Sequence, residues 1–428
     1  MKITIFALGS RGDVQPFLAL AVGLRQAGHQ VTLAAPYNFV EWIRSYGVSV
    51  HSVSWSIQEF LKKPEVQAAF KSRNLVRAFR VMRDGLEPGF MTANDDFWEA
   101  GQDTEFVVQT IPLMCGVEVA GQRGLPMAFA YVMPFYAPPT RAFPSFGLPQ
   151  RFSLGSGYNY LTHVVLSHIP GALRPLNRWR ATRLGLPPWR SAWESLNARR
   201  SFGTPSLYGY SPTVLPKPLE WNNAHHVTGY WLLDAPPDWP LRAPVDLLRF
   251  LESGPPPVYV GFGSMSDEDP ERLTRLTLRA LDLTGQRGVL ATGWGGVTQL
   301  APSASVCYID NVPHDWLFPR MAAVVHHGSA GTTGAGLRAG VPSIITPFGL
   351  DQYAWADLVV KLGVGPHAAN IKKLTAEKLA EAINTAINDS DLRARAAALG
   401  EKIRAENGIA RAVEVIERHA ADFSQRKL

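Results

Sequence analysis

Cysteine is nearly absent from this chain: of 428 residues only Cys115 and Cys307 are cysteines, and they lie far apart in the sequence. A disulfide framework or a structural metal cage needs several cysteines at short spacings, so both are excluded. Long apolar runs are also missing, because no stretch approaches the roughly 20 apolar residues of a membrane-spanning helix. The apolar run Ile3–Leu8 is too short for a secretion signal. We therefore expect a cytoplasmic protein.

Charge is scarce as well, at 18% of residues, whereas hydrophobic residues make up 46%. This composition excludes global disorder and provides for a large core. The chain is too long for one ordinary α/β domain and fits two domains of roughly 200 residues each. The net charge of +6 is unevenly distributed: residues 1–200 hold 21 Lys and Arg against 13 Asp and Glu, a net of +8.

Two helical-looking stretches of the first half carry much of this positive charge. Their basic residues are Lys71, Arg73, Arg77, Arg80 and Arg83 in the first stretch and Arg174, Arg178, Arg180, Arg183 and Arg190 in the second, where Trp179, Trp189 and Trp193 are interleaved. The pattern is typical of solvated helix faces, and the alternative is a peripheral contact with a membrane or an anionic acceptor. No nucleic-acid recognition motif accompanies the charge, so we expect no nucleic-acid partner.

The order of apolar runs and turns in the first half predicts a parallel sheet. Strands are predicted at 2–8, 31–35, 48–53, 105–110, 127–132 and 207–210, with helices at 15–27 and 39–46. Strand and helix alternating at this spacing require right-handed crossovers between parallel strands. Residues 55–100 and 135–200 interrupt the pattern with long insertions that are rich in aromatic residues and proline.

Seven prolines between Asp234 and Pro257 mark a domain boundary, because such a segment is stiff and cannot pass through the centre of a sheet. Beyond it, strands are predicted at 257–261, 288–291, 306–309, 322–325 and 343–346, and helices at 375–388, 391–405 and 409–422. We predict an N-terminal domain of residues 1–233, a linker of residues 234–257, a C-terminal domain of residues 258–408 and a final helix at 409–428 that packs back on the N-terminal domain. The predicted fold class is α/β, with two doubly wound parallel-sheet domains facing a cleft.

The most informative motif runs from His326 to Thr333, between an apolar strand and a helix. A strand that leads through a turn of small residues into a helix leaves backbone N–H groups free at the positive end of the helix, where phosphate binds. His327 adds a hydrogen-bond donor, and Asp351 and Gln352 further along the chain can bind sugar hydroxyls. Phosphate and sugar together indicate a nucleotide sugar as the ligand.

These motifs resemble those of the nucleotide-sugar-dependent glycosyltransferases of family 1 with the GT-B fold. The similarity is to the branch of the sterol glucosyltransferases and the glycopeptide-antibiotic glycosyltransferases. The segments that carry it are Gly9–Pro16, Val258–Met265, Asn311–Phe318, the His327 turn, Gly340–Pro342 and Asp351-Gln352. Together they span nearly the whole C-terminal half and the first thirty residues, whereas the two insertions carry no signature of the family.

The resemblance implies a donor site in the C-terminal domain, where His327 and the turn amides would neutralise the leaving diphosphate and Val312 would bind the base. The donor-binding residues predicted in this way are Ser10, Ser264, Trp294, Val312, His327, Ser329, Ala330, Gly331, Thr332, Asp351 and Gln352. Alternatives stay open for three of them: Ser264 as a plain strand end, Trp294 as a core residue and Asp351 as the N-cap of a helix. His326 is expected to point to the opposite face and to pack in the core.

The resemblance also implies an inverting reaction in which Asp13, in the first strand-to-helix loop, is the base and His327 the second catalytic residue. The alternative role of Asp13 is to cap the helix that follows. A single displacement with the base opposite the leaving group turns an α-linked donor into a β-linked product. We expect neither a cofactor nor a metal. The acidic triplet Asp267-Glu268-Asp269 precedes Pro270 and a helix, where cap chemistry explains it.

We expect a hexose, glucose above all, to pass from UDP or dTDP to a hydroxyl of an apolar acceptor such as a sterol, a lipid or a polyketide. Phe135, Tyr136, Phe143 and Phe146 are the predicted acceptor-binding residues, with a place in the core as the alternative for each. Two other functions stay open: a nucleotide-sugar epimerase or hydrolase, and a non-catalytic nucleotide-sugar-binding partner protein. The protein is expected to be a monomer or a weak dimer.

Overall fold

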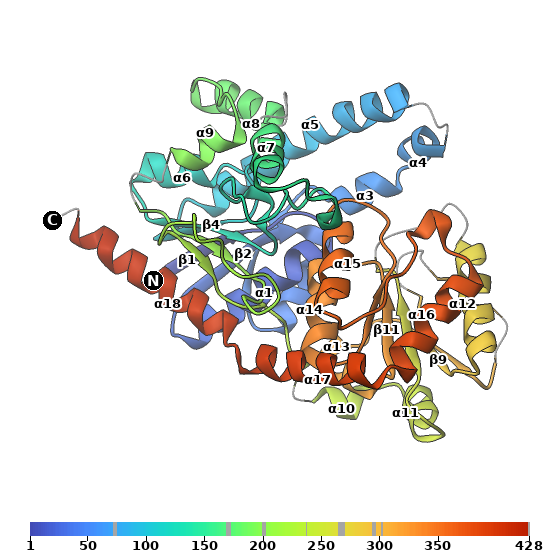
Figure 1. The fold of residues 1–428 in the computed structure, drawn as a ribbon. Coiled ribbons are helices and arrows are strands. Elements are labelled where there is room, and N and C mark those ends of the chain that lie inside the picture. The colour runs from blue at the N-terminus through green and yellow to red at the C-terminus, as the bar shows by residue number, and fades with distance from the viewer. Residues whose placement is uncertain are drawn as a thin grey trace.

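The structure is a computed structural model that describes residues 1–71, 75–167, 173–198, 203–236, 238–263, 270–292, 297–300 and 303–426. It contains one seven-stranded and one five-stranded parallel sheet, one in each half of the chain, and helices surround both sheets (Figure 1). The prediction of two doubly wound α/β halves is therefore confirmed.

The sheet of the N-terminal half has the strand order β3-β2-β1-β4-β5-β6-β7. Its strands are β1 (Lys2–Phe6), β2 (Gln30–Pro36), β3 (Ser49–Val53), β4 (Phe106–Gln109), β5 (Met127–Tyr131), β6 (Ser206–Tyr208) and β7 (His225–Val227). β4 and β5 are buried along their whole length because both faces of the sheet are covered, which explains their continuous apolar sequences. β7 is not among the predicted strands, since its sequence is short, polar and without alternation.

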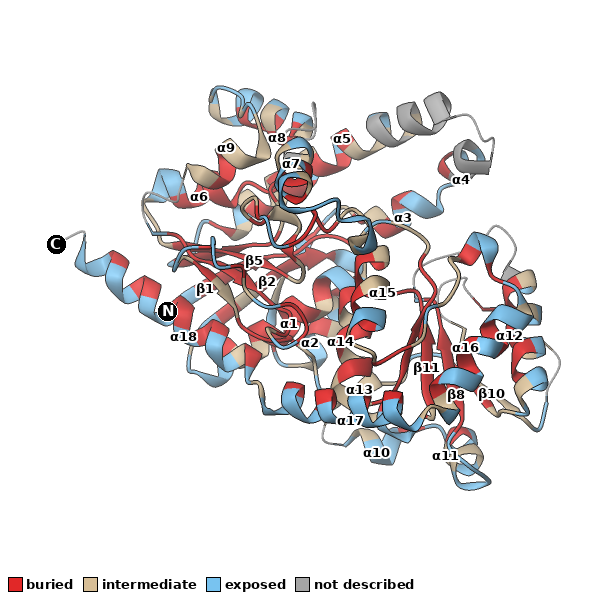
Figure 2. Ribbon diagram, in the orientation of Figure 1, coloured by how far each residue is buried: buried red, intermediate tan, exposed pale blue. Residues whose placement is uncertain are grey.

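Helices cover both faces of this sheet, so that buried residues lie on both sides of it (Figure 2). The helices of the N-terminal half are α1 (Arg11–Gln26), α2 (Val40–Ser45), α3 (Ile57–Lys62), α4 (Pro64–Lys71), α5 (Leu75–Ala100), α6 (Gly116–Arg123), α7 (Ser156–Ser167), α8 (Arg174–Trp179) and α9 (Ala192–Asn197). One core joins α1 and α2 to the sheet, and the other joins α5, α6 and α8. The two long insertions of the sequence thus supply most of one helical layer.

The sheet of the C-terminal half has the strand order β10-β9-β8-β11-β12. Its strands are β8 (Val258–Gly261), β9 (Gly288–Ala291), β10 (Val306–Ile309), β11 (Ala323–His326) and β12 (Ser343–Ile345). Its helices are α12 (Pro270–Thr284), α13 (His314–Leu317), α14 (Ala330–Ala339), α15 (Gln352–Lys361), α16 (Ala376–Asn388) and α17 (Ser390–Ala405). None of the described helices combines the length and the apolar sequence that crossing a bilayer requires.

The proline-rich segment between the halves contains two short helices, α10 (Trp239–Arg242) and α11 (Val245–Glu252). Pro240 and Pro244 lie at the starts of these helices, where their missing N–H has no intrahelical role. Leu247 of α11 is buried beside Tyr259 and Val289 in a core of the C-terminal half. The last helix, α18 (Gly408–Gln425), returns to the N-terminal half and packs against α1.

The basic residues of the second positively charged stretch are engaged within the protein. The ion pairs are Arg174–Glu87 at 3.0 Å, Arg178–Glu87 at 2.8 Å, Arg183–Asp95 at 2.7 Å and Arg180–Glu118. Trp179 is buried, and its indole N–H donates to Asp95. These pairs link the α8 region to α5 and α6. The side chains of Arg174, Arg178 and Arg183 are still 57%, 62% and 59% exposed, as expected of a solvated face, and only Arg180 is buried. The side chains of the first stretch, Lys71 to Arg83, lie outside the described residues.

Candidate functional site

The candidate site lies where loops from the two sheets meet. Strand order reverses between β1 and β4 in one sheet and between β8 and β11 in the other, and ligands of such sheets bind at these switch points. The loop after β1 carries Gly9 and Ser10 and leads into α1, of which Asp13 is the third residue, and His327 follows β11 directly. Helix α1, which starts in the first of these loops, contacts α14, which starts just after His327 (Figure 1). The folding of the two halves thus brings α1, which carries Asp13 in its first turn, against α14, which begins just after His327.

Asp13 is held by the residue that caps its helix. Ser10 is the N-cap of α1, and Asp13, the third residue of the helix, is its partner in a capping box, so Asp13 takes part in capping without being the N-cap itself. The backbone N–H and the Oγ hydroxyl of Ser10 both donate to Oδ2 of Asp13, at 2.7 and 2.9 Å. Oδ1 of Asp13 has no hydrogen-bond partner among the described residues. The carboxylate is therefore oriented through one oxygen, and the other is available to a ligand.

The pKa of Asp13 is raised above its ordinary value because protein surrounds the carboxylate, and the two bonds from Ser10 offset part of that rise. The side chain is nevertheless exposed to solvent by surface area, which means that it is lined by protein but open toward the cleft. A carboxylate that is partly desolvated but still accessible has the environment that a general base needs before its substrate binds.

Asp351 lies within electrostatic range of Asp13 although it belongs to the other half of the chain. Burial and then the negative charge of Asp13 raise the pKa of Asp351 to about 6. Asp351 occupies the N-cap position of α15, yet its side chain makes no capping hydrogen bond. The N-cap alternative therefore does not account for this carboxylate.

Replacing Asp351 by Asn is expected to stabilise the ligand-free protein more at pH 7.5 than at pH 5. The folded-state pKa of about 6 lies above the ordinary value, so folding favours the protonated carboxyl, and this contribution is lost as the pH rises through 6. The Asn variant has no such loss, and its advantage should grow by about 1 kcal/mol over this interval. Urea unfolding at both pH values measures it. If the difference in unfolding free energy between variant and wild type is the same at both pH values, ionisation of Asp351 does not destabilise the folded protein.

His327 is almost fully buried, and its environment keeps the imidazole neutral. Burial lowers the pKa of His327 to about 4, and Nδ1 has no hydrogen-bond partner among the described residues. At neutral pH the ring therefore has one N–H donor and one acceptor nitrogen. The preceding His326 is completely buried, and its Nδ1 accepts the backbone N–H of Gly328 at 3.1 Å. His326 thus packs in the core, as its position in the strand predicted.

The turn after His327 leaves backbone donors at the start of α14. Ser329 caps the helix, and its Oγ accepts the N–H of Thr332 at 3.4 Å. The amides of Ala330 and Gly331 belong to the first helical turn, which has no intrahelical acceptors. A Cβ added to Gly331 would meet no atom within 4 Å, so this turn faces open space. These donors lie at the positive end of the helix dipole, where the sequence predicts that a phosphate binds.

Two glycines make room for the two candidate catalytic side chains. Gly9 has φ +137°, and a Cβ there would come within 2.4 Å of Oδ2 of Asp13. Gly263, which follows β8, has φ +59°, and its Cβ would come within 2.8 Å of Cε1 of His327. Each glycine therefore combines a backbone conformation that is costly for other residues with close contact to a functional group.

Replacing Gly263 by Ala is expected to displace the His327 ring and to reduce the transfer rate about 10- to 100-fold, because misplacement by about 1 Å has such an effect. The protein should stay folded, since the turn lies at the cleft and not in the core. Steady-state kinetics, with the thermal midpoint measured alongside, checks this. Gly285→Ala is the matched control, because it has φ +63° but open space around its Cβ. Equal losses in both variants would assign the effect to backbone strain alone.

Gln352 is buried, and its amide oxygen already accepts hydrogen bonds within the protein. Oε1 accepts the backbone N–H groups of Phe348 and Gly349 at 2.7 and 3.2 Å. Only Nε2 is left for a sugar hydroxyl, so Gln352 also fixes the loop that presents Asp351. In this loop, directly before Asp351, Leu350 has φ +52°, an unfavourable conformation for a residue with a Cβ, and its side chain is exposed.

Arg11 joins the two halves at the cleft and was not among the predicted site residues. Its guanidinium donates to the Asn311 side chain at 2.7 Å and lies 4.7 Å from the Trp42 ring. Asn311 directly precedes Val312, the residue predicted to bind the base. The signal was present in the sequence, since Arg11 lies between Ser10 and Asp13, but a contact across 300 residues cannot be read from spacing.

The predicted acceptor-binding residues divide into two pairs. Phe143 and Phe146 are buried in the core; the Phe146 ring lies 4.9 Å from that of Trp355, and Phe143 packs against Trp221. The structure corrects the expectation that these two residues bind the acceptor, because both rings are packed inside the core. Phe135 and Tyr136 are half-buried and stay candidates. Ser264, Trp294 and the triplet Asp267 to Asp269 lie outside the described residues.

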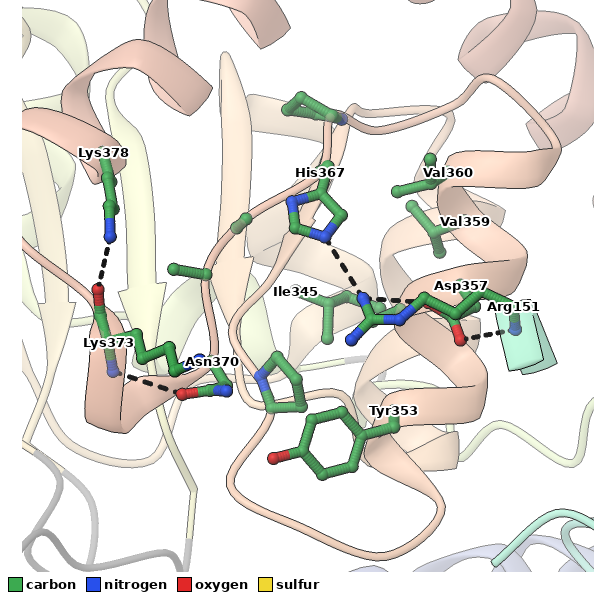
Figure 3. Close-up of a pocket in the computed structure, with 15 residues that line it drawn as sticks. Arg151, Ile345, Tyr353, Asp357, Val359, Val360, His367, Asn370, Lys373 and Lys378 are labelled. Carbon is green, nitrogen blue, oxygen red and sulfur yellow. Dashed lines mark hydrogen bonds and ion pairs between the residues drawn. The ribbon is translucent and has the colours of Figure 1, made fainter. Parts of the chain in front are cut away.

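A cavity of about 230 Å³ lies beside α15 (Figure 3). Arg151 enters it from the N-terminal half, where its guanidinium meets His367 at 3.3 Å and its backbone N–H donates to Asp357 at 3.0 Å. The volume is below the roughly 300 Å³ at which ligand pockets begin. Neither Asp13, His327 nor Asp351 lines it, so this cavity is a contact between the halves and not the donor site.

Comparisons with known proteins place the chain in a class. A model of the glycosyltransferase family 28 N-terminal domain matches residues 3–141, and the erythromycin biosynthesis protein CIII-like C-terminal domain matches residues 296–418. The solved glycotransferase of kitacinnamycin has a TM-score of 0.67 at 20% identity and covers 98% of this chain and 99% of its own. The Streptomyces sp. SF2575 glycosyltransferase SsfS6, complexed with thymidine diphosphate, has a TM-score of 0.61 at 20% identity over 98% and 99%. The chain has the GT-B fold of these solved glycosyltransferases.

Curated relatives narrow the family to which the chain is assigned. The sterol 3-beta-glucosyltransferases of Cryptococcus neoformans var. neoformans and Yarrowia lipolytica are each 35% identical, over 98% and 100% of this chain. The chain spans only 27% and 30% of their lengths. It belongs to family 1 of the GT-B glycosyltransferases and is related to both the sterol and the antibiotic glycosyltransferases. The resemblance drawn from the motifs is confirmed.

Proposed function

We propose that this protein transfers a hexose, glucose in the first instance, from a UDP- or dTDP-sugar to a hydroxyl of an apolar acceptor, with inversion at the sugar carbon. The observation that carries the proposal is the pair of carboxylates from opposite halves: Asp13, with Oδ1 available, and Asp351, whose pKa the charge of Asp13 helps to raise. The neutral His327 and the open first turn of α14 lie at the same cleft. Relatives named for glucosyl transfer to sterols support the choice of sugar and acceptor.

In the proposed reaction, Oδ1 of Asp13 takes the proton of the acceptor hydroxyl while the hydroxyl oxygen forms its bond to C1. The bond between C1 and the phosphate oxygen breaks, and its electron pair leaves with the nucleoside diphosphate. His327 and the amides of the α14 turn donate to the diphosphate as its charge grows, which is usually the largest catalytic contribution. Asp351 holds sugar hydroxyls, and Gln352 fixes the loop that carries Asp351.

Transfer is expected to continue in the presence of excess EDTA. The described residues contain no group of three or more His, Cys, Asp or Glu side chains placed to hold a metal ion, and helix-dipole donors at α14 serve the diphosphate instead. Initial rates with EDTA and with added Mg²⁺ check this prediction. Loss of turnover in EDTA that Mg²⁺ restores would require a metal in the donor site.

The function itself is tested by a mass-spectrometric screen of UDP- and dTDP-hexoses against sterols, polyketides, flavonoids and lipids. We expect a product heavier by one hexose, with a β-linkage from an α-linked donor. Release of free sugar or its isomer from donor alone would favour the hydrolase or epimerase. Donor binding without turnover across the whole panel would favour the non-catalytic binding protein.

A further inference from the structure

Arg11 connects the first turn of α1 to the C-terminal half of the chain. It is the first residue of the helix, two positions before Asp13, and its Nη1 group donates to Oδ1 of Asn311 at 2.7 Å. Asn311 belongs to residues 310–313, which connect β10 to α13. We call these four residues the nucleobase loop, because they include Val312. One side chain thus joins the turn that contains Asp13 to the loop predicted to bind the base of the donor.

Two further contacts orient the guanidinium of Arg11 within its own half. Nε donates to Oε1 of Gln15, one helical turn further along α1, at 3.2 Å. The guanidinium carbon lies 4.7 Å from the centre of the Trp42 ring in α2, a distance at which a cation and an aromatic ring attract each other. The bond to Asn311 is therefore made by a side chain that is already oriented, which reduces the entropy lost when that bond forms.

The charge of Arg11 also reaches both ends of the nucleobase loop. The side chain is partly exposed, but the protein around the guanidinium lowers the pKa of Arg11, and Tyr46 and then Asp310 offset part of that effect. Burial, then the positive charge of Arg11 and then His327 lower the pKa of His314 to about 4. Asp310 begins the loop, and His314 directly follows it as the first residue of α13. Arg11 therefore interacts with this segment at its start, at Asn311 and at its end.

A constraint on Arg11 is also a constraint on Asp13. Ser10, which directly precedes Arg11, donates its backbone N–H and its Oγ hydroxyl to Oδ2 of Asp13, in the capping box that starts α1. The orientation of the carboxylate therefore depends on the backbone of residues 10–13, to which Arg11 belongs. Because misplacement of a reacting group by about 1 Å lowers a rate about 100-fold, a contact that fixes this turn has a kinetic effect.

We propose that Arg11 is a positioning residue that couples occupation of the nucleobase loop to the placement of Asp13. The inference rests on the proposed function and adds a role for the part of the donor that is remote from the reacting carbon. A base bound at Val312 holds the loop and with it the side chain of Asn311. The bond between Asn311 and Arg11 then holds the first turn of α1, in which Asp13 meets the acceptor hydroxyl. Binding energy from the base is in this way used for orientation at the reacting centre.

Steady-state kinetics of Arg11→Gln, Asn311→Ala and the double variant, with calorimetric titration of UDP and dTDP, test the coupling. Each single variant should lower kcat about 10- to 100-fold. The affinity for the nucleotide should stay as in wild type, because the base is assigned to Val312. The double variant should lose no more than the single variants, since residues that act as one unit are not additive. Arg11→Lys should recover part of the loss, because an ammonium still donates to Asn311 but lacks the planar fork that also reaches Gln15.

Arg25→Gln is the matched control. Arg25 lies in the last turn of the same helix, and its guanidinium donates to the Tyr46 carbonyl at 3.0 Å, a contact within the N-terminal half. This variant should keep the wild-type rate and nucleotide affinity. Thermal midpoints are measured for every variant. A rate loss in Arg11→Gln that is matched by loss of folded protein would make Arg11 a purely structural residue and overturn the proposal.

A second measurement does not depend on turnover. Trp42 lies against Arg11, so protein labelled with fluorotryptophan reports on this contact by fluorine NMR. Trp42→Phe assigns the resonance among those of the 12 tryptophans. UDP or dTDP should shift the Trp42 resonance in wild type and in Arg25→Gln. It should leave that resonance in place in Asn311→Ala, in which the nucleobase loop is disconnected from Arg11.

Three results would overturn the proposal: nucleotide that binds without shifting the Trp42 resonance, rate losses that add in the double variant, and a nucleotide affinity that falls as far as the rate in Arg11→Gln. The last of these would make Arg11 a direct ligand of the diphosphate. Hexose transfer with an unshifted Trp42 resonance would remove this inference and leave the proposed function. A shifted resonance without any hexose transfer would leave the coupling and remove the proposed function.

Discussion

Asp13→Asn is expected to lower the rate of transfer by about 10²- to 10⁴-fold, the contribution of a positioned general base. The amide keeps the shape of the carboxylate, and its oxygen can still accept the N–H of Ser10, but it cannot take the proton of the acceptor. The affinity for the nucleotide sugar should stay nearly unchanged, because donor binding is assigned to the other half of the chain. Steady-state kinetics and calorimetric titration of the donor measure the two quantities.

Asp103→Asn is the matched control, since Asp103 is an exposed carboxylate of the same half that pairs with Lys2. It should leave both rate and affinity as in wild type. The pH profile gives a second test: because the pKa of Asp13 is raised, the acid limb of the wild-type rate should lie above the ordinary range of an aspartate. Turnover of the Asn variant within about tenfold of wild type would end the assignment of Asp13 as the base.

His327→Ala should reduce the turnover rate by about 10²- to 10³-fold, as expected when one preorganised donor to a developing negative charge is removed. The affinity for the nucleoside diphosphate product should fall as well, because the product carries the charge that the ring stabilises. Turnover and diphosphate affinity, measured together, distinguish this from the Asp13 variant, in which only turnover falls. His327→Asn should recover part of the loss, since an amide can still donate.

His226→Ala is the control, because His226 is also partly buried and has a pKa lowered to about 4, but lies on β7 at the edge of the N-terminal sheet. Titration of His327 should not change the wild-type rate between pH 5.5 and 8, since the pKa of His327 is about 4. An Ala variant with normal diphosphate affinity would exclude contact between this ring and the leaving group.

The positions of Asp13, His327 and the α14 turn could be predicted because their signals are local. Each follows a short apolar strand, and small or capping residues define the start of the next helix within a few positions. The sequence places Asp13 at a helix start but does not reveal that Ser10 is the cap, because either residue type can serve. In the structure Ser10 is the N-cap and Asp13 completes a capping box through Oδ2, which leaves Oδ1 without a partner among the described residues.

Contacts between distant segments could not be predicted. The charge of Asp13 acting on Asp351, and the bond from Arg11 to Asn311, depend on how two separately folded sheets lie against each other. The ion pairs of the exposed arginines in and after α8 could not be predicted because their partners, Glu87 and Asp95, lie in α5, some distance earlier in the chain. Phe143 and Phe146 resembled a ligand wall for the same reason, since hydrophobic content alone does not distinguish a core ring from an exposed one.

Helix α18 imposes an order of events during synthesis. Ala412, Val413 and Ile416 complete the core that contains α1, and Ile409 lies directly on Gly23. The ribosome makes these residues after the sheets of both halves, so the outer face of α1 stays uncovered until α18 has emerged. Residues 1–233 expressed alone would expose the surface that α18 covers. Apolar surface exposed in this way makes a nascent chain prone to aggregation during that interval.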